Sequence, residues 1–148
     1  MRAVVQRAAE ASVVVEETVT GEIGRGLVVF LGIEEGDTEA DLAYIADKVT
    51  GLRVFDDENG IPNLSVRDVG GAVLLVSQFT LCADARKGRR PSYIRAARPE
   101  QAIPLYESAI AMIGRSVPVQ SGVFQANMLV RLVNDGPHTI LLDSRRMF

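Results

Sequence analysis

Residues 26–33, Gly-Leu-Val-Val-Phe-Leu-Gly-Ile, form an unbroken apolar run between glycines. A short run of this kind is typical of a strand that is buried on both faces. The run Ala-Val-Leu-Leu-Val at residues 72–76 predicts a second buried strand. The β-branched residues 11–15 predict an earlier strand, and residues 16–20 predict a turn and a return strand. The first third of the chain is therefore expected to be built mainly of strands.

Two amphipathic segments predict helices. Asp37 or Thr38 can cap the first helix, because a short side-chain oxygen accepts a hydrogen bond from a free N–H of the first turn. This helix is expected to end at Gly51, and the second is expected to begin at Pro99 and to end at Gly114. The predicted apolar stripes are Leu42, Ile45, Ala46, Val49 and Leu52 in the first helix and Ile103, Tyr106, Ile110 and Ile113 in the second.

Two final strands are expected at residues 128–133 and 139–142. No linker, repeat or low-complexity stretch divides the chain. The sequence therefore predicts a single α+β domain over residues 1–148, rich in strands and with two main helices. A domain of this length buries roughly 70% of the surface that its unfolded chain exposes. Its core is therefore expected to be adequate without disulfides or metals.

Composition limits the possible chemistry. Cys82 and His138 are the single cysteine and the single histidine, so neither a disulfide nor a zinc site of cysteines and histidines can form within one chain. We expect no cofactor and no metal. The N-terminal apolar run is too short for a signal peptide, and no stretch approaches the roughly 20 apolar residues of a membrane helix. These features predict a cytoplasmic protein that does not bind membranes.

The net charge of −3 is unlike that of most nucleic-acid-binding domains, which are basic. A local positive run nevertheless exists at Arg86-Lys87-Gly88-Arg89-Arg90, followed by Arg95 and Arg98. This run is either a binding site for nucleic-acid phosphates or a solvated loop, and the residues alone do not decide between the two. A nucleic-acid-binding module without catalysis is accordingly one alternative function.

Polar residues follow the predicted strands at two places. Ser77-Gln78-Phe79-Thr80 lies at the end of the strand at residues 72–76. It is either the start of a functional loop held by the strand or an ordinary strand end without a function. Asn134-Asp135-Gly136-Pro137 lies between the last two strands and is either an ordinary turn or, with a cis Gly-Pro bond, a special backbone geometry. No serine–histidine–acid set and no carboxylate pair is evident. The residues alone therefore do not identify a reaction.

These two motifs together resemble the D-aminoacyl-tRNA deacylase family. The resemblance covers nearly the whole chain, because flanking segments match as well. These segments are Met1–Arg7, Gly36–Thr38, Asp68–Gly71 and the basic loop with its Pro91-Ser92 end. The resemblance implies hydrolysis of the ester of D-aminoacyl-tRNA, and of mischarged Gly-tRNA, as a proofreading step in translation. It also implies a barrel-like, mostly antiparallel sheet and a homodimer with its active sites at the interface.

The resemblance further assigns roles to residues. It implies that Ser77, Gln78, Phe79 and Thr80 form the catalytic wall, and that Arg86, Lys87, Arg89 and Arg90 bind tRNA. It implies a cis bond between Gly136 and Pro137, held by Arg7, that reaches into the partner's pocket and rejects L-amino acids. Phe124 and Met128 are expected to contact the terminal adenosine.

Two mechanisms fit this resemblance. In the first, the backbone N–H groups of Phe79 and Thr80 stabilise the oxyanion, and the 2′-hydroxyl of the substrate orients or activates the water. In the second, Thr80 is a covalent nucleophile, but an unassisted threonine is weak. A related class with the same fold, which removes L-alanine from the wrong tRNA, carries a different strand-end motif and a trans Gly-Pro bond.

The sequence departs from the family's pattern at three positions. Gln125 and Asn127 stand where the family often has glycine and aspartate, which puts the contacts to adenosine in question. His138 stands where valine is common, and we expect it to lie at the rim of the site without a catalytic role. Cys82 follows the segment Ser77–Leu81 and is expected to be a packing residue.

Overall fold

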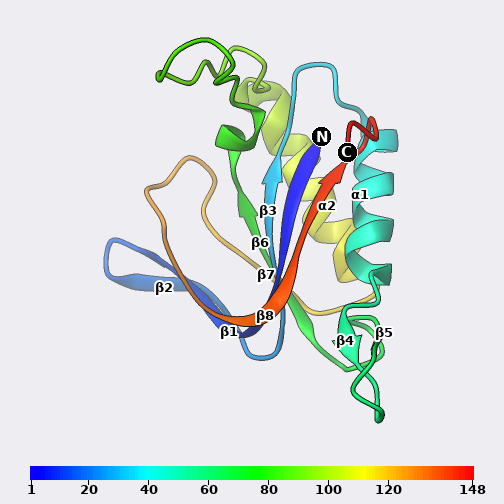
Figure 1. Cartoon of the computed structure of the whole chain (residues 1–148). Coiled ribbons are helices and arrows are strands. Elements are labelled where there is room, and N and C mark those ends of the chain that lie inside the picture. The colour runs from blue at the N-terminus through cyan, green and yellow to red at the C-terminus, as the bar shows by residue number, and fades with distance from the viewer.

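A strongly curved sheet organises the protein, for which a computed structural model describes all 148 residues (Figure 1). The first strand pairs with three others, and only the last strand is longer than it. The elements in chain order are β1 (Arg2–Val15), β2 (Thr18–Ile23), β3 (Gly26–Gly32), α1 (Glu39–Gly51), β4 (Phe55–Asp56), β5 (Pro62–Leu64), β6 (Ala72–Ser77), the 3-10 turn η1 (Phe79–Cys82), α2 (Pro99–Gly114), β7 (Val119–Ser121) and β8 (Leu129–Asp143).

The main sheet has the order β2-β1-β3-β6-β7, and β8 pairs with β1. The pairs β1–β2, β1–β3 and β1–β8 are antiparallel, whereas β3–β6 and β6–β7 are parallel. The two ends of the sheet curl toward each other, and a side chain at Gly21 of β2 would meet the carbonyl oxygen of Ser121 in β7 at 2.6 Å. The predicted α+β fold, with two helices and a nearly closed, barrel-like sheet, is confirmed.

Alternate residues of the buried strands supply two separate cores, because successive side chains of a strand point to opposite faces. Leu27, Val29 and Leu31 of β3 pack in a cluster of 23 buried residues with both helices. Val28 points to the other face and joins a smaller cluster of seven buried residues with Leu74 of β6. Figure 1 shows both helices on one side of the sheet. Burial on both faces explains the unbroken apolar runs in the sequence.

The first helix follows its prediction closely. Thr38 is its N-cap, and the carboxylate of Asp41 accepts a hydrogen bond from the backbone N–H of Thr38 at 2.8 Å. Asp37, the other candidate cap, is buried and pairs with the α-amino group of Met1 at 2.7 Å. Neither helix of the protein is both long enough and apolar enough to cross a membrane.

The predicted stripe of the second helix was partly wrong. Its ends at Pro99 and Gly114 are as expected, and Tyr106 and Ile113 are buried. Ile103 and Ile110, however, are only half-buried, and the buried face also includes Ala102, Leu105 and Ala109. The prediction favoured large apolar residues and therefore left out the two alanines of the buried face.

The last two predicted strands are in fact one strand, β8, which pairs along almost the whole of β1. Thr139 pairs with Gln6 and Asn134 pairs with Ala8, so residues 135–138 stand opposite the single residue Arg7. The predicted turn is therefore a local bulge in a continuous ladder. The short strands β4, β5 and β7 were not predicted, because two or three residues show no periodicity.

The close approach of β3 and β6 gives a test of the fold. A Cβ at Gly26 would lie 1.9 Å from the carbonyl oxygen of Ala72, its partner in the β3–β6 ladder, whereas a Cβ at Gly24 would have no atom within 4 Å. We expect Gly26→Ala to lower the free energy of unfolding by roughly 3 kcal/mol or more. We expect Gly24→Ala to change it by less than about 0.5 kcal/mol. Urea unfolding curves measure both, and superimposable curves would contradict the packing described.

Candidate active site

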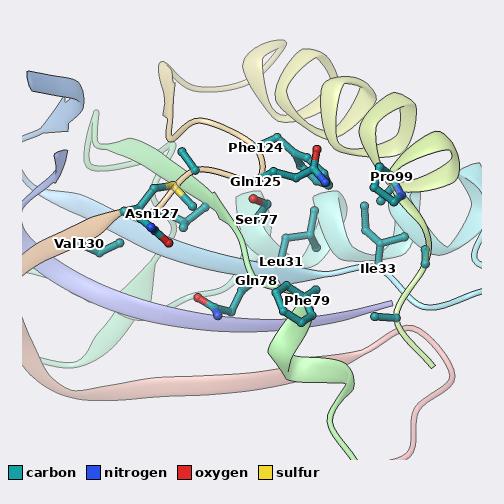
Figure 2. A pocket seen from close by; sticks show the side chains of 16 residues that line it. Leu31, Ile33, Ser77, Gln78, Phe79, Pro99, Phe124, Gln125, Asn127 and Val130 are labelled. Atoms are coloured by element: carbon teal, nitrogen blue, oxygen red, sulfur yellow. The ribbon is translucent and has the colours of Figure 1, made fainter. Parts of the chain in front are cut away.

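A cavity of about 560 Å³ opens where the parallel strands β3 and β6 end side by side. Its walls come from these strand ends, η1, the segment before α2 and the loop after β7, as Figure 2 shows. Eleven of its sixteen lining residues are hydrophobic, which suits an organic ligand held by a few polar groups. They are Leu31, Ile33, Val76, Ser77, Gln78, Phe79, Ala96, Ala97, Pro99, Ala102, Phe124, Gln125, Ala126, Asn127, Met128 and Val130.

Ser77, Gln78 and Phe79 of the motif Ser77–Thr80 line one wall of this cavity. The backbone N–H of Gln78 donates to the carbonyl oxygen of Leu31 at 2.8 Å, which ties the end of β6 to β3. Phe79 and Thr80 then open η1, and the first N–H groups of a helical turn have no acceptor within it. These N–H groups are therefore free to bind an acceptor on a ligand.

Thr80 differs from its neighbours. Ser77, Gln78 and Phe79 line the cavity, but Thr80 does not. Its hydroxyl oxygen accepts a hydrogen bond from the side-chain amide of Gln78 at 2.5 Å. Three of the four predicted catalytic residues therefore line the cavity together, whereas Thr80 lies next to them in η1 with its hydroxyl bonded to Gln78.

The turn η1 is held from behind by Arg2. Its guanidinium donates to the carbonyl oxygen of Leu81 at 3.1 Å and to the carboxylate of Asp143 at 3.0 Å. A further ion pair joins Arg2 to Glu34 at 3.8 Å. The end of β8 thus fixes the backbone that carries the Phe79 and Thr80 N–H groups.

Phe124 and Met128 line the same cavity as the Ser77–Phe79 segment. Figure 2 shows Phe124 across the cavity from Gln78 and Phe79. The ring of Phe124 rests against Tyr106 of α2, with the ring centroids 5.7 Å apart. Gln125 has a φ of 64°, in the left-handed region that glycine enters without steric cost. This backbone explains why glycine suits the position.

Gly136 and Pro137 lie outside this cavity, in the bulge of β8. The bond between them is cis, the isomer that the resemblance implies. Both residues are exposed, and a Cβ on Gly136 would find its nearest atom at 3.6 Å, an ordinary contact. That atom belongs to the side chain of Asn134, so a methyl group at Gly136 would fit within the chain.

Arg7 holds the bulge in place. Its side chain is only 6% exposed and donates to the carbonyl oxygens of Asp135 at 3.0 Å and of Gly136 at 3.0 Å. It also donates to the carbonyl oxygen of Val54 at 2.7 Å and pairs with Asp56 at 3.4 Å. The planar fork of a guanidinium serves several fixed acceptors at once, which a lysine cannot do.

The basic loop, residues 84–92, projects from the end of the molecule opposite the β4–β5 hairpin (Figure 1). Asp84 and Ser92 close it through two backbone hydrogen bonds of 2.8 and 2.9 Å. Arg86 is bonded to Asp84, and this hydrogen bond holds the pKa of the Asp84 carboxyl well below its usual range. The remaining cations, at Lys87, Arg89 and Arg90, are exposed and have no acidic partner.

Comparison with known proteins identifies the family of the chain. A sequence model of the family described as D-Tyr-tRNA(Tyr) deacylase matches residues 4–143. The D-aminoacyl-tRNA deacylase of Koribacter versatilis is 58% identical over 149 residues, covering all of both chains. That of Thermotoga petrophila is 54% identical, also over the full length of both. The chain belongs to the D-aminoacyl-tRNA deacylase family. Membership makes it a hydrolase.

Solved structures agree with this deacylase fold. The c-Myc DNA unwinding element binding protein superposes with a TM-score of 0.92 at 41% identity, covering 97% of this chain and 98% of its own. A structure described as a probable eukaryotic D-amino acid tRNA deacylase superposes with a TM-score of 0.82, covering 96% of this chain and 98% of its own. At 17% identity the second likeness supports the fold alone.

Several residues of the candidate site carried no signal in the sequence. Leu31 and Ile33 line the cavity, yet they look like any apolar residues of a buried strand. Val54 and Asp56 accept hydrogen bonds from Arg7, which also binds the bulge, although both residues lie far from the bulge in the chain. Only the folded backbone reveals that these residues belong to the site.

Cys82 is the packing residue that the sequence analysis expected. It is fully buried, and its thiol lies 3.5 Å from the carbonyl oxygen of Ile33. Burial, reinforced by the negative charge of Glu34, raises the pKa of the Cys82 thiol from 9.0 to about 11. At pH 8 the reactive thiolate is therefore scarce in the folded deacylase.

This environment predicts that Cys82 resists thiol reagents. A rise in the thiol pKa from 9.0 to about 11 lowers the thiolate fraction at pH 8 about 100-fold, and burial blocks access as well. We expect iodoacetamide to modify the native protein at least about 100-fold more slowly than the urea-unfolded protein. Mass spectrometry of time points measures both rates, and equal rates would show that the thiol is accessible and ionised.

Proposed function

We propose that the chain hydrolyses the ester bond of D-aminoacyl-tRNA, and of mischarged Gly-tRNA, to the free amino acid and tRNA. The observation that carries this proposal is the cavity that Ser77, Gln78 and Phe79 of the first motif line. Family membership supplies the substrate class, and the cavity is large enough for the terminal nucleoside of a tRNA. Because aminoacyl-tRNA is used in translation, the reaction belongs in the cytoplasm.

The backbone of η1 is the proposed catalytic group. Attack of water on the ester places negative charge on the carbonyl oxygen, and fixed N–H groups stabilise that charge more in the transition state than in the ground state. The N–H groups of Phe79 and Thr80 start the turn and lack intrahelical acceptors. Arg2 holds this turn through Leu81, so the donors are preorganised.

The hydrogen bond from Gln78 to Thr80 favours this mechanism over a threonine nucleophile. The amide of Gln78 binds a lone pair of the Thr80 hydroxyl oxygen, the atom that would have to attack. No base contacts that hydroxyl to remove its proton, and a threonine without a base is weak. The 2′-hydroxyl of the terminal ribose is the proposed group that orients or activates the water.

The active site is proposed to form between two copies of the chain. Gly136 and Pro137 are exposed on the bulge of β8 and do not line their own protomer's cavity. Strand β8 pairs only with β1, so its other edge is free. Its outward residues Leu129, Val133 and Leu141 are exposed apolar side chains. An unpaired edge with exposed apolar residues favours association with a second chain.

In this dimer, the Gly136-Pro137 segment of one protomer would read chirality in the cavity of the other. The carbonyl oxygens of Gly136 and Pro137 are proposed to bind the ammonium group of the amino acid. An L side chain would then point into backbone and clash, whereas a D side chain would point outward. Glycine has no side chain to exclude and should be accepted.

The exposed cations Lys87, Arg89 and Arg90, together with Arg86, are proposed to bind tRNA phosphates. The overall charge of −3 does not attract nucleic acid, so a local concentration of positive charge supplies that attraction. The loop projects from the same end of the molecule as η1, which it follows in the chain (Figure 1). The bound RNA would thus place its terminal ester at the Ser77–Thr80 wall.

Two variants test the chemistry. We expect wild type to hydrolyse D-aminoacyl-tRNA and Gly-tRNA, and to leave L-alanyl-tRNA intact. Thr80→Ala should stay within about 10-fold of the wild-type rate, because it keeps the backbone donor, whose loss would cost roughly 10²–10³ in rate. Gly136→Ala should lose more, because the new methyl group crowds the amino-acid site. Single-turnover deacylation measures both rates.

Gly136→Ala suits this comparison because it is not expected to disturb the fold. Its Cβ makes only ordinary contacts within the protomer, so urea unfolding should match that of wild type. An inactive Thr80→Ala beside a fully active Gly136→Ala would show that the hydroxyl is the catalyst and would overturn the backbone mechanism. Binding of tRNA without any hydrolysis by wild type would instead indicate a binding module.

Mixed dimers test the shared site. Ala126→Trp should block the cavity, which Ala126 lines, and Gly136→Ala should damage the filter. Each variant alone should be inactive. If the site is shared, a heterodimer has one site with an open cavity and an intact Gly136, so an equal mixture should recover roughly a quarter of wild-type activity. Co-refolding and deacylation assays measure this recovery, which a site contained in one protomer cannot produce.

A further inference from the structure

An exposed pair of aromatic rings stands at the mouth of the cavity. Phe79, which lines the cavity, packs edge-to-face against Tyr93, with ring centroids 5.3 Å apart and an interplanar angle of 72°. Phe79 is 58% exposed and Tyr93 is 40% exposed. Figure 2 shows the Phe79 ring at the edge of the site, where β6 gives way to η1. In an edge-to-face pair at least one face of each ring remains free for another ligand.

Backbone contacts fix the position of Tyr93. The N–H of Glu35 donates to the carbonyl oxygen of Arg95 at 2.9 Å, and the N–H of Ala97 donates to that of Ile33 at 2.9 Å. The side chain of Arg95 also pairs with the buried Glu34 at 3.0 Å. The segment that carries Tyr93 is therefore joined to the end of β3, so the ring is presented by ordered backbone.

The surroundings of this ring pair are basic. Tyr93 directly follows Ser92, which closes the loop that carries the unpaired cations Lys87, Arg89 and Arg90. Exposed rings beside free cations form the typical surface for single-stranded nucleic acid, in which bases stack on rings and phosphates meet positive charge. Double-helical RNA is recognised through its phosphates and hydroxyls and does not use such rings.

We propose that Phe79 and Tyr93 form a stacking platform for the unpaired nucleotides that precede the terminal nucleotide of the tRNA. This inference rests on the proposed function, which places the terminal nucleoside in the cavity. The chain of the RNA leaves the cavity past Phe79, and its next base meets the free face of Tyr93. The phosphates that follow then reach Lys87, Arg89 and Arg90, so the platform joins the cavity to the basic loop.

Substitutions of Tyr93 test the platform. Tyr93→Leu keeps apolar bulk but removes the ring, Tyr93→Trp keeps a ring, and Ile94→Ala trims the neighbouring exposed side chain as a matched control. Each variant is assayed with D-aminoacyl-tRNA and with the D-aminoacyl ester of adenosine alone. A base stacked on an aromatic ring contributes about 1–3 kcal/mol, which corresponds to about 5- to 150-fold in affinity.

We expect Tyr93→Leu to lower kcat/KM for the tRNA substrate at least about 5-fold, through KM, with kcat and the rate on the adenosine ester unchanged. Tyr93→Trp and Ile94→Ala should behave as wild type. The salt dependence of KM should also persist in Tyr93→Leu, because stacking releases no counterions. An equal loss on both substrates, no loss on either, or a change in dimerisation measured by sedimentation would overturn the platform.

A binding measurement separates this inference from the proposed function. A labelled single-stranded tetranucleotide with the sequence of a tRNA 3′ end is titrated with wild type and with Tyr93→Leu. Weaker binding by the variant supports the platform even if no ester is hydrolysed, and that outcome would place the failure in the proposed function. Equal binding, beside normal hydrolysis by wild type, would refute the platform alone.

Discussion

The buried guanidinium of Arg7 is the interaction on which the arrangement of the candidate site depends. Opposite Arg7 the β1–β8 ladder is interrupted, so the carbonyl groups of residues 135–138 lose the strand partners that a regular ladder would give them. Arg7 supplies donors to two of these carbonyls and a third to Val54. One side chain thereby gives hydrogen-bond donors to the carbonyls of Asp135 and Gly136 in an exposed, irregular segment of a long strand. The bulge is accordingly an ordered part of the sheet.

The cavity follows from the parallel pairing of β3 and β6. Both strands end at the same edge of the sheet, and their chains then diverge, one toward α1 and the other into η1. Such a divergence beyond the carboxyl ends of parallel strands leaves a crevice that ligands can occupy. Apolar residues at the strand ends line the crevice, and η1 lies at its border. The same short segment therefore ends a strand, closes a wall and presents free N–H groups.

Sequence reasoning succeeded where one periodic signal decided the outcome. The runs at residues 26–33 and 72–76 became β3 and β6 because burial on both faces requires apolar residues throughout. It failed where tertiary contacts decided, as with the alanines of α2 and the union of two predicted strands into β8. The motifs of the site were found by resemblance, since backbone donors have no residue signature. Leu31 could not be placed at the cavity, because a lining residue and a core residue of a strand look alike.

The bulge at Gly136 and Pro137 also bears on how the protein can evolve. If main-chain carbonyls there select the substrate, most point mutations elsewhere leave the selecting atoms untouched, because every residue type carries the same carbonyl. The exposed tip has little side chain to exchange, and its path is set by Arg7 from another strand. Selectivity of this kind survives most neutral substitutions, and a single substitution seldom changes it. A lineage that acquired a new preference would have to redirect the backbone itself.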